Sequence, residues 1–235
     1  MTGADARGAR GGADDVAPPG ALPRADGRLG LRERKRLAAM LRIQAVALDL
    51  FEARGFDSVT VEEVAEAADV SPSSVYRYFG TKEEIVLWDE YDADMDAQLE
   101  LALAAEVPLD GVHQVVRAAL VGLSRDGEET IRRRLRLMVT TPALEQAATA
   151  RAYAVAELIG RLLARRLGRP EADLEVQVFS HALAGGLLGL FHHWHGSGFD
   201  EPLLDVVERT FAIFEEGLDV VTAIGSLRAG PAAEG

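Results

Sequence analysis

The sequence predicts an all-α fold, and three observations lead to it. Between the two termini, apolar residues recur at intervals of three and four, which is the spacing of one helix face. No stretch alternates apolar and polar residues between turn pairs, as the strands of a sheet would. Helix-start signals recur along the chain, with Pro142, Pro170 and Pro202 at positions suited to a first helical turn.

Composition divides the chain into four parts. Residues 1–29 are rich in Gly, Ala, Pro, Asp and Arg and lack apolar periodicity, which predicts a disordered tail, and residues 226–235 have the same character. Residues 30–82 and 83–225 carry the helical spacing. We expect the first of these to be a small front domain and the second a larger helical bundle.

The front domain has signals for three helices. The first runs from about Leu31 to Arg54 and ends at Gly55. Thr60 followed three residues later by Glu63 is a capping box that opens a short helix. An N-cap serine followed by proline opens the next one, which we place at Pro72–Tyr78.

The bundle begins with a second capping box. Thr81 and Glu84 predict the start of a long helix that extends through roughly Ala105. Beyond Pro108 the spacing predicts further amphipathic helices, placed near 111–125, 128–139, 142–167, 170–195 and 201–224.

Composition excludes several classes of function. Cysteine is absent, so disulfides, thiolate catalysis and thiolate metal sites are excluded. We see no apolar run near the roughly 20 residues of a membrane span, and no signal-peptide stretch in residues 1–30. There is also no Gly-rich phosphate loop, nucleophile elbow or His-Glu metal pair. We expect a cytoplasmic protein that is not an enzyme, binds no membrane and needs no cofactor.

The net charge of −13 is unevenly distributed. Residues 1–82 carry 12 basic and 12 acidic side chains, so the whole excess of acid lies in residues 83–235. A local positive face is what phosphate binding requires, while an acidic remainder repels nucleic acid. A solvated charged face is the alternative interpretation of the basic block near the start of the first helix, which consists of Arg28, Arg32, Arg34, Lys35, Arg36 and Arg42 around Glu33.

Two short helices joined by a tight turn, after a longer helix, match a helix-turn-helix. In the second short helix only Val75 and Phe79 are expected to face inward. Its other positions offer hydroxyls, a guanidinium and phenols, which suit phosphates and base edges in a major groove. The alternative is a solvated surface helix. The side chains concerned are Ser71, Ser73, Ser74, Tyr76, Arg77 and Tyr78.

The stretch from Ile43 to Val86 resembles the DNA-binding domain of the TetR family along its whole length, most specifically in Val75-Tyr76-Arg77-Tyr78-Phe79 with Lys82. The sequence departs from the family at Asp69, where glycine is usual. The resemblance implies contacts to double-stranded DNA by residues of the helix-turn-helix, and with the basic block we expect the DNA-binding residues to be Arg32, Arg34, Lys35, Arg36, Thr60, Ser71, Ser73, Ser74, Tyr76, Arg77, Tyr78 and Lys82.

The same resemblance implies that the bundle dimerises. A single helix-turn-helix makes too few contacts for useful specificity, whereas a two-fold dimer reads a palindrome. Small residues in the helix near 170–195 permit close approach of a second helix. A monomeric core packing on its own glycines is the alternative. We expect a dimer interface formed by Gly185, Gly186, Gly189, Leu190, Val207, Phe211 and Phe214.

An effector pocket is also implied. The Arg-rich run at 131–138 resembles a family subtype that includes mycofactocin-associated regulators, for which acyl-CoA effectors are known. Arg beside Leu and Met suits an apolar ligand with an anionic group, although an exposed Arg face pairing with an acidic helix at 83–100 explains the run as well. We expect the pocket residues to be His113, Arg136, Tyr153, Phe191 and Trp194.

Three histidines, His181, His192 and His195, share one helix face, but no carboxylate accompanies them on it, and we expect no metal. Together these features predict a DNA-binding transcription regulator, a homodimeric repressor released from a palindromic operator by a small-molecule effector. The alternatives are a helical adaptor without DNA binding and an enzyme. An adaptor would be unaffected by neutralising Arg77 and Lys82.

Overall fold

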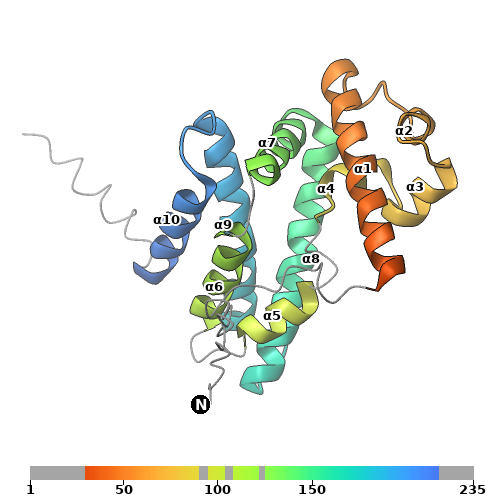
Figure 1. Ribbon diagram of the computed structural model, residues 1–235. Coiled ribbons are helices and arrows are strands. Elements are labelled where there is room, and N and C mark those ends of the chain that lie inside the picture. The colour runs from red at the N-terminus through yellow and green to blue at the C-terminus, as the bar shows by residue number, and fades with distance from the viewer. Residues whose placement is uncertain (1–29, 90–94, 104–107, 122–124, 217–235) are drawn as a thin grey trace, which may run out of the picture.

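The computed structural model describes residues 30–89, 95–103, 108–121 and 125–216, and the expected disordered tails lie outside them. Within these ranges all regular structure is helical, which confirms the all-α fold (Figure 1). The helices are α1 (Leu31–Arg54), α2 (Val61–Ala67), α3 (Pro72–Phe79), α4 (Lys82–Leu87), α5 (Met95–Leu103), α6 (Pro108–Val121), α7 (Arg125–Thr140), α8 (Pro142–Leu167), α9 (Leu174–Gly196) and α10 (Leu203–Glu216).

Figure 1 shows α1, α2 and α3 gathered at one side of the molecule and α9 and α10 at the other. The long helix α8 runs between the two groups, and α7 crosses near its upper end. Helix α4 lies between α1 and α8 and packs on α1, α7 and α8. The helix-turn-helix therefore meets the bundle through α1, α4 and α7.

Capping fixes the short helices of the front domain as the sequence predicts. The Thr60 hydroxyl accepts a bond from the Glu63 N–H at 3.2 Å, and the Glu63 carboxylate accepts one from the Thr60 N–H at 2.8 Å. Ser71 accepts from the Ser74 N–H at 3.2 Å, with Pro72 as the first helical residue. Each cap satisfies N–H groups that a helix start leaves without an intrahelical partner.

The turn between α2 and α3 has a left-handed residue. Asp69 lies at φ 54°, the region that glycine enters without steric cost and other residues rarely adopt. The position is thus one where glycine, the residue usual in the TetR family, is favoured sterically.

The core of the front domain extends into the bundle. Ile43, Phe51 and Val64 are almost fully buried in it, and Phe51 packs against Phe56 with ring centroids 4.9 Å apart. The same apolar cluster continues through Ile85 and Val86 of α4 to Leu137 of α7 and Leu144 of α8. One continuous core therefore joins the helix-turn-helix to the bundle.

The predicted long helix from Thr81 to about Ala105 is wrong. Helix α4 ends at Leu87, and Trp88 takes an extended conformation with φ −61° and ψ 137°. The Trp88 ring packs edge-on against Phe79 at 5.8 Å, and its carbonyl accepts a bond from the buried Gln44 amide. Tertiary contacts thus end the helix where the local sequence would continue it.

The five helices expected beyond Pro108 correspond to α6–α10 of the described residues, although not in every boundary. Pro142–Leu167 is confirmed as α8. The helix expected from Pro170 begins instead at Leu174, because the Asp173 carboxylate caps the N–H groups of Glu175 and Val176. The bundle core contains Leu103, Ile159, Leu183, Trp194 and Phe211.

By length and composition alone α9 is apolar enough to cross a membrane, with a mean hydropathy of 1.4 over its most apolar window. The expectation that the sequence holds no such run is therefore wrong by these measures. In the fold, α9 packs on α7, α8 and α10, and core helices of globular proteins satisfy the same measures.

Candidate DNA-binding interface

Helix α3 presents one apolar and one polar face. Val75 and Phe79 are buried, with 1% and 7% of their surfaces exposed. Most of the remaining side chains face solvent, among them Tyr76 at 49% exposure. The exposed face of α3 therefore offers hydrogen-bonding groups, and a major groove is wide enough to admit an α-helix. Of the predicted contacts here, Ser71, Ser73, Tyr76 and Arg77 are exposed and Ser74 and Tyr78 half-buried.

The serines at the start of α3 form a hydroxyl network. The Ser71 Oγ lies 2.9 Å from both the Ser73 Oγ and the Ser74 Oγ. The Arg77 guanidinium donates to the Ser74 Oγ at 3.3 Å and lies 4.9 Å from the centre of the Tyr78 ring. These contacts hold Arg77 along the helix, so less side-chain entropy is lost when it binds an anion.

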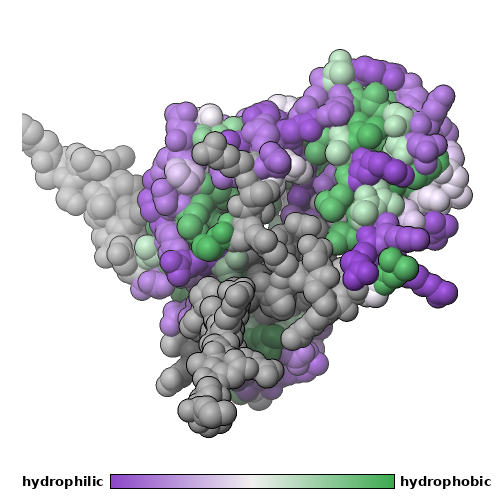
Figure 2. Space-filling model, in the orientation of Figure 1, coloured by the Kyte–Doolittle hydropathy of each residue, from purple (hydrophilic) through white to green (hydrophobic). Residues whose placement is uncertain are grey.

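Of the basic block, Arg28 lies outside the described residues and the other members lie on α1. Arg32, Arg34, Lys35 and Arg36 are all exposed. The first turns of α1 project from the molecule as a mostly hydrophilic surface (Figure 2). Thr60, the predicted phosphate contact at the start of α2, is exposed as well.

Lys82 is placed differently from the other predicted contacts. Its ammonium donates to the Phe56 carbonyl at 2.8 Å and to the Val59 carbonyl at 3.1 Å, and it lies 4.1 Å from the centre of the Phe56 ring. In this structure Lys82 therefore fastens the start of α4 to the loop between α1 and α2. Its predicted phosphate contact would require the ammonium to share or leave these carbonyls.

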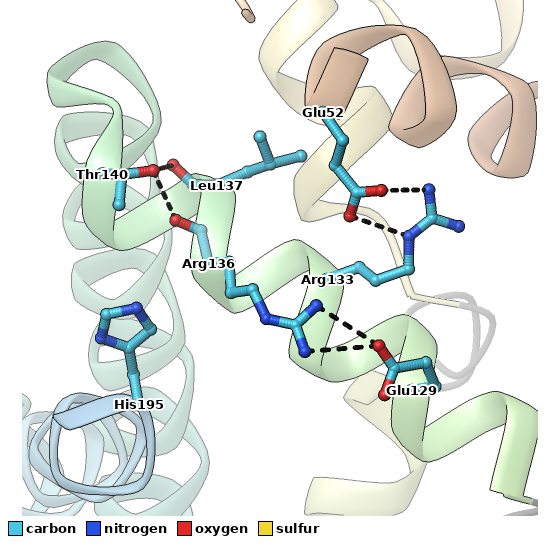
Figure 3. Close-up of a pocket in the computed structure, with 7 residues that line it drawn as sticks. All are labelled: Glu52, Glu129, Arg133, Arg136, Leu137, Thr140 and His195. Carbon is cyan, nitrogen blue, oxygen red and sulfur yellow. Dashed lines mark hydrogen bonds and ion pairs between the residues drawn. The ribbon is translucent and has the colours of Figure 1, made fainter. Parts of the chain in front are cut away.

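A groove of about 440 Å³ opens at the boundary between the front domain and the bundle. Figure 3 shows Arg133 turned towards Glu52 of α1, Arg136 turned back along α7 to Glu129, and His195 standing on the neighbouring helix. The bonds from Arg136 to Glu129 are long, at 3.3 and 3.4 Å, and its side chain is 46% exposed. Arg136 is the one predicted pocket residue that lines this groove.

The other four predicted pocket residues do not line this groove. Tyr153 is exposed and lines a separate shallow groove along α8, of about 520 Å³, while Trp194 is fully buried and donates to the Glu201 carbonyl. His113 stacks on Phe211 and lies 3.0 Å from Glu208. Phe191 is half-buried and packs against the bundle core. The single effector pocket therefore stays a prediction, since helical periodicity gives the face of a residue but not its depth.

The histidines of α9 have separate neighbours. His181 packs edge-on against Tyr153 at 4.9 Å, His195 packs against Phe199 at 5.7 Å, and His192 is exposed. Over the described residues, no group of three or more His, Cys, Asp or Glu side chains is arranged to hold a metal ion.

The predicted dimer residues divide into three sets. Gly185 and Gly189 are exposed. A Cβ on Gly186 would lie 2.4 Å from the Phe214 ring, so this glycine serves the contact between α9 and α10 within the chain. The other three, Leu190, Val207 and Phe211, are core residues at 3%, 3% and 0% exposure, and the prediction that they form the interface is wrong.

Arginines of the run at 131–138 form ion pairs across the domain boundary. Arg133 bonds Asp49 and Glu52 of α1, and the Glu52 carboxylate is the main cause that raises the pKa of its guanidinium. Arg134 bonds Asp89, just beyond α4, and Arg151 of α8 bonds Glu84. The expected pairing with an acidic segment at 83–100 thus holds for Arg134, while Arg133 binds α1 instead. The sequence signal was the arginine run itself.

Residues 43–87 match the family described as bacterial regulatory proteins, tetR family, and residues 106–219 match the MftR C-terminal domain. The chain is 30% identical over 191 residues to the mycofactocin biosynthesis transcriptional regulator MftR of Mycobacterium tuberculosis, covering 79% of this chain and 94% of that protein. The chain belongs to the TetR family. It is accordingly a DNA-binding transcription regulator.

Other relatives agree with this assignment. The chain is 36% identical over 147 residues to the HTH-type transcriptional regulator TcmR of Streptomyces glaucescens, covering 59% of this chain and 65% of that one. Among solved structures, the SmeT–triclosan complex has a TM-score of 0.51 at 20% identity, covering 74% and 90% of the two chains. NalD of Pseudomonas aeruginosa has the same score and identity, covering 77% and 97%. These two structures share the TetR fold.

Proposed function

We propose that this TetR-family regulator is a homodimeric repressor that binds a palindromic operator and is released by a small-molecule effector. The observation that carries the proposal is the polar face of α3, where exposed hydroxyls surround an arginine held in place by Ser74. Phenols and hydroxyls bind phosphates, and Arg77 is the side chain best suited to a guanine edge. The protein acts in the cytoplasm and has no catalytic role.

The test is selection of genomic DNA fragments by the purified full chain. The control is Tyr76→Ala/Arg77→Ala, which removes two exposed side chains and leaves the buried side of α3 unchanged. We expect a palindrome to be enriched by the natural protein and lost in the control. Equal enrichment by both proteins would contradict the role given to α3.

The dimer interface is expected on the exposed face of α9. Leu174 and Val178 are 75% and 58% exposed, and Ala182, Gly185 and Gly189 continue the same face at intervals of three and four residues. Ile213 adds an exposed apolar side chain on the neighbouring α10. Large apolar side chains beside small residues permit two helices to approach closely, and two-fold symmetry uses the patch twice.

Val178→Glu tests this interface by sedimentation equilibrium. The substitution places a carboxylate against each side of a two-fold contact, and we expect the dimer dissociation constant to rise by at least about 100-fold. The matched control is Val121→Glu on α6, which alters another exposed valine (65%) outside α9. Equal dissociation constants for the two variants would place the interface elsewhere.

The effector is proposed to bind the groove at the domain boundary. Arg136 is loosely paired and lies 5.2 Å from the Phe199 ring, so an anionic group beside an apolar part would find both partners there. A ligand in this groove would also contact Glu52 of α1 and Arg133 of α7, which join the two domains. Arg136→Gln should weaken release of the operator by the effector without altering operator affinity in its absence.

A further inference from the structure

The C-terminal end of α4 is closed by side chains from two different domains. A helix leaves its last four carbonyls without intrahelical partners. Here the carbonyls of Ile85 and Trp88 accept bonds from the Gln44 amide at 2.9 and 2.8 Å. The carbonyls between them, on Val86 and Leu87, accept from the Arg134 guanidinium at 2.7 and 2.8 Å.

Both donors are held in place. Gln44 lies on α1 in the front domain and is 4% exposed, one of the few buried polar residues of the described chain. Arg134 lies on α7 in the bundle with 11% of its side chain exposed, and its remaining guanidinium nitrogen bonds Asp89 at 2.9 Å. Of the residues whose carbonyls they bind, Ile85, Val86 and Leu87 are buried and Trp88 is half-buried, so water cannot replace most of these bonds without opening the core.

We propose that Arg134 and Gln44 are positioning residues for operator binding: together they fix the end of α4 and thereby the orientation of the helix-turn-helix relative to the bundle. Figure 1 shows α4 between α1 and α8, so this short helix connects the front domain to the bundle. A displacement of α7 would break the bonds from Arg134 to the carbonyls of Val86 and Leu87. The bonds from Gln44 on α1 would remain. The front domain would then turn relative to its partner in the dimer.

This inference rests on the proposed dimeric repressor and makes a distinct prediction about half-site spacing. Each added base pair moves one half-site by about 3.4 Å along and about 35° around the duplex. Two rigidly held helix-turn-helix domains therefore discriminate strongly between operators of different spacing. Loss of the shared cap should weaken that discrimination, whereas a general loss of folded protein would lower affinity for all spacings equally.

The experiment measures affinity of the full chain for the selected operator and for versions with two base pairs inserted or removed at its centre. We expect Arg134→Gln to reduce the ratio between native and altered spacing by about 10-fold, within the usual range of coupling between sites. Gln44→Met removes the amide donor on the front-domain side and should also reduce this ratio. Arg134→Lys keeps the charge and should restore part of the preference.

The matched control is Arg161→Gln, which removes the same charge from an exposed position on α8. This variant should keep the spacing preference of the natural protein. That result would show that the change in Arg134→Gln does not come from the loss of one positive charge. An unchanged ratio in both Arg134→Gln and Gln44→Met would overturn the proposal. If Arg134→Gln does not fold, the same affinity ratio measured for Gln44→Met and Arg134→Lys tests the proposal. Failure to select any operator would instead count against the proposed function.

Discussion

Replacing Lys82 with methionine separates two roles that the sequence and the structure give to this residue. The resemblance to TetR regulators implies a phosphate contact, whereas the structure places the ammonium on the carbonyls of Phe56 and Val59. Methionine keeps the aliphatic stem and removes the charge. The substitution should therefore loosen the loop between α1 and α2 if the observed bonds stabilise it.

The magnitude follows from those contacts. A hydrogen bond to a charged group contributes about 1.5–3 kcal/mol, and Lys82 makes two, but it is only half-buried, so water recovers part of each. We estimate a loss of about 2 kcal/mol in the free energy of unfolding. For a chain of this length, this corresponds to a fall in Tm of about 4–8 °C.

Thermal unfolding followed by circular dichroism measures this loss, and operator titrations at several salt concentrations measure the charge contribution. Lys35→Met is the matched control, since Lys35 is the other lysine of the chain and is exposed on α1. It should leave Tm nearly unchanged and lower the salt slope by about one. If Lys82→Met behaves in the same way, with no loss of stability, the structural role argued here is wrong.

Three further outcomes are expected. Asp69→Gly relieves a left-handed conformation and should raise the free energy of unfolding by up to about 1 kcal/mol in a urea titration, since the steric relief exceeds the entropic cost of glycine. Gly186→Ala should lower it by about 1 kcal/mol or more, because the clash with Phe214 exceeds the gain in helix propensity. Glu63 has a pKa below its ordinary value of 4.5, chiefly through the N–H of the α2 N-cap, so its contribution is present above pH 4.5 and lost as pH falls below it. The Tm difference between the natural protein and Glu63→Gln should shrink over that interval.

The features that the sequence predicted correctly depend on local contacts. The capping box of Thr60 and Glu63 closes over three residues, and the N-cap Ser71 acts on Ser74 in the same way. A pattern of adjacent residue types is enough to find such contacts. The same holds for α8, whose start is set by a proline and whose end is set by Gly168 in a left-handed conformation.

The errors concern contacts between distant residues. Helix α4 ends early because Gln44 and Arg134, more than 40 residues away on either side, bind its last carbonyls. Likewise, periodicity places Gly185 and Gly186 on adjacent faces of α9 but does not tell which face meets α10. Only the packing shows that Gly186 touches Phe214 while Gly185 stays exposed.

The arrangement of acids and bases accounts for DNA binding by a chain of net charge −13. The front domain is neutral overall in sequence, but several of its carboxylates are paired away from α3. Asp49 and Glu52 bind Arg133 of the bundle, and Glu63 binds Arg54. The exposed bases at the start of α1 and on α3 therefore meet the phosphates with less opposing charge nearby. The two ion pairs of Arg133 also attach the front domain to α7, so they help to fix the orientation of the helix-turn-helix as well.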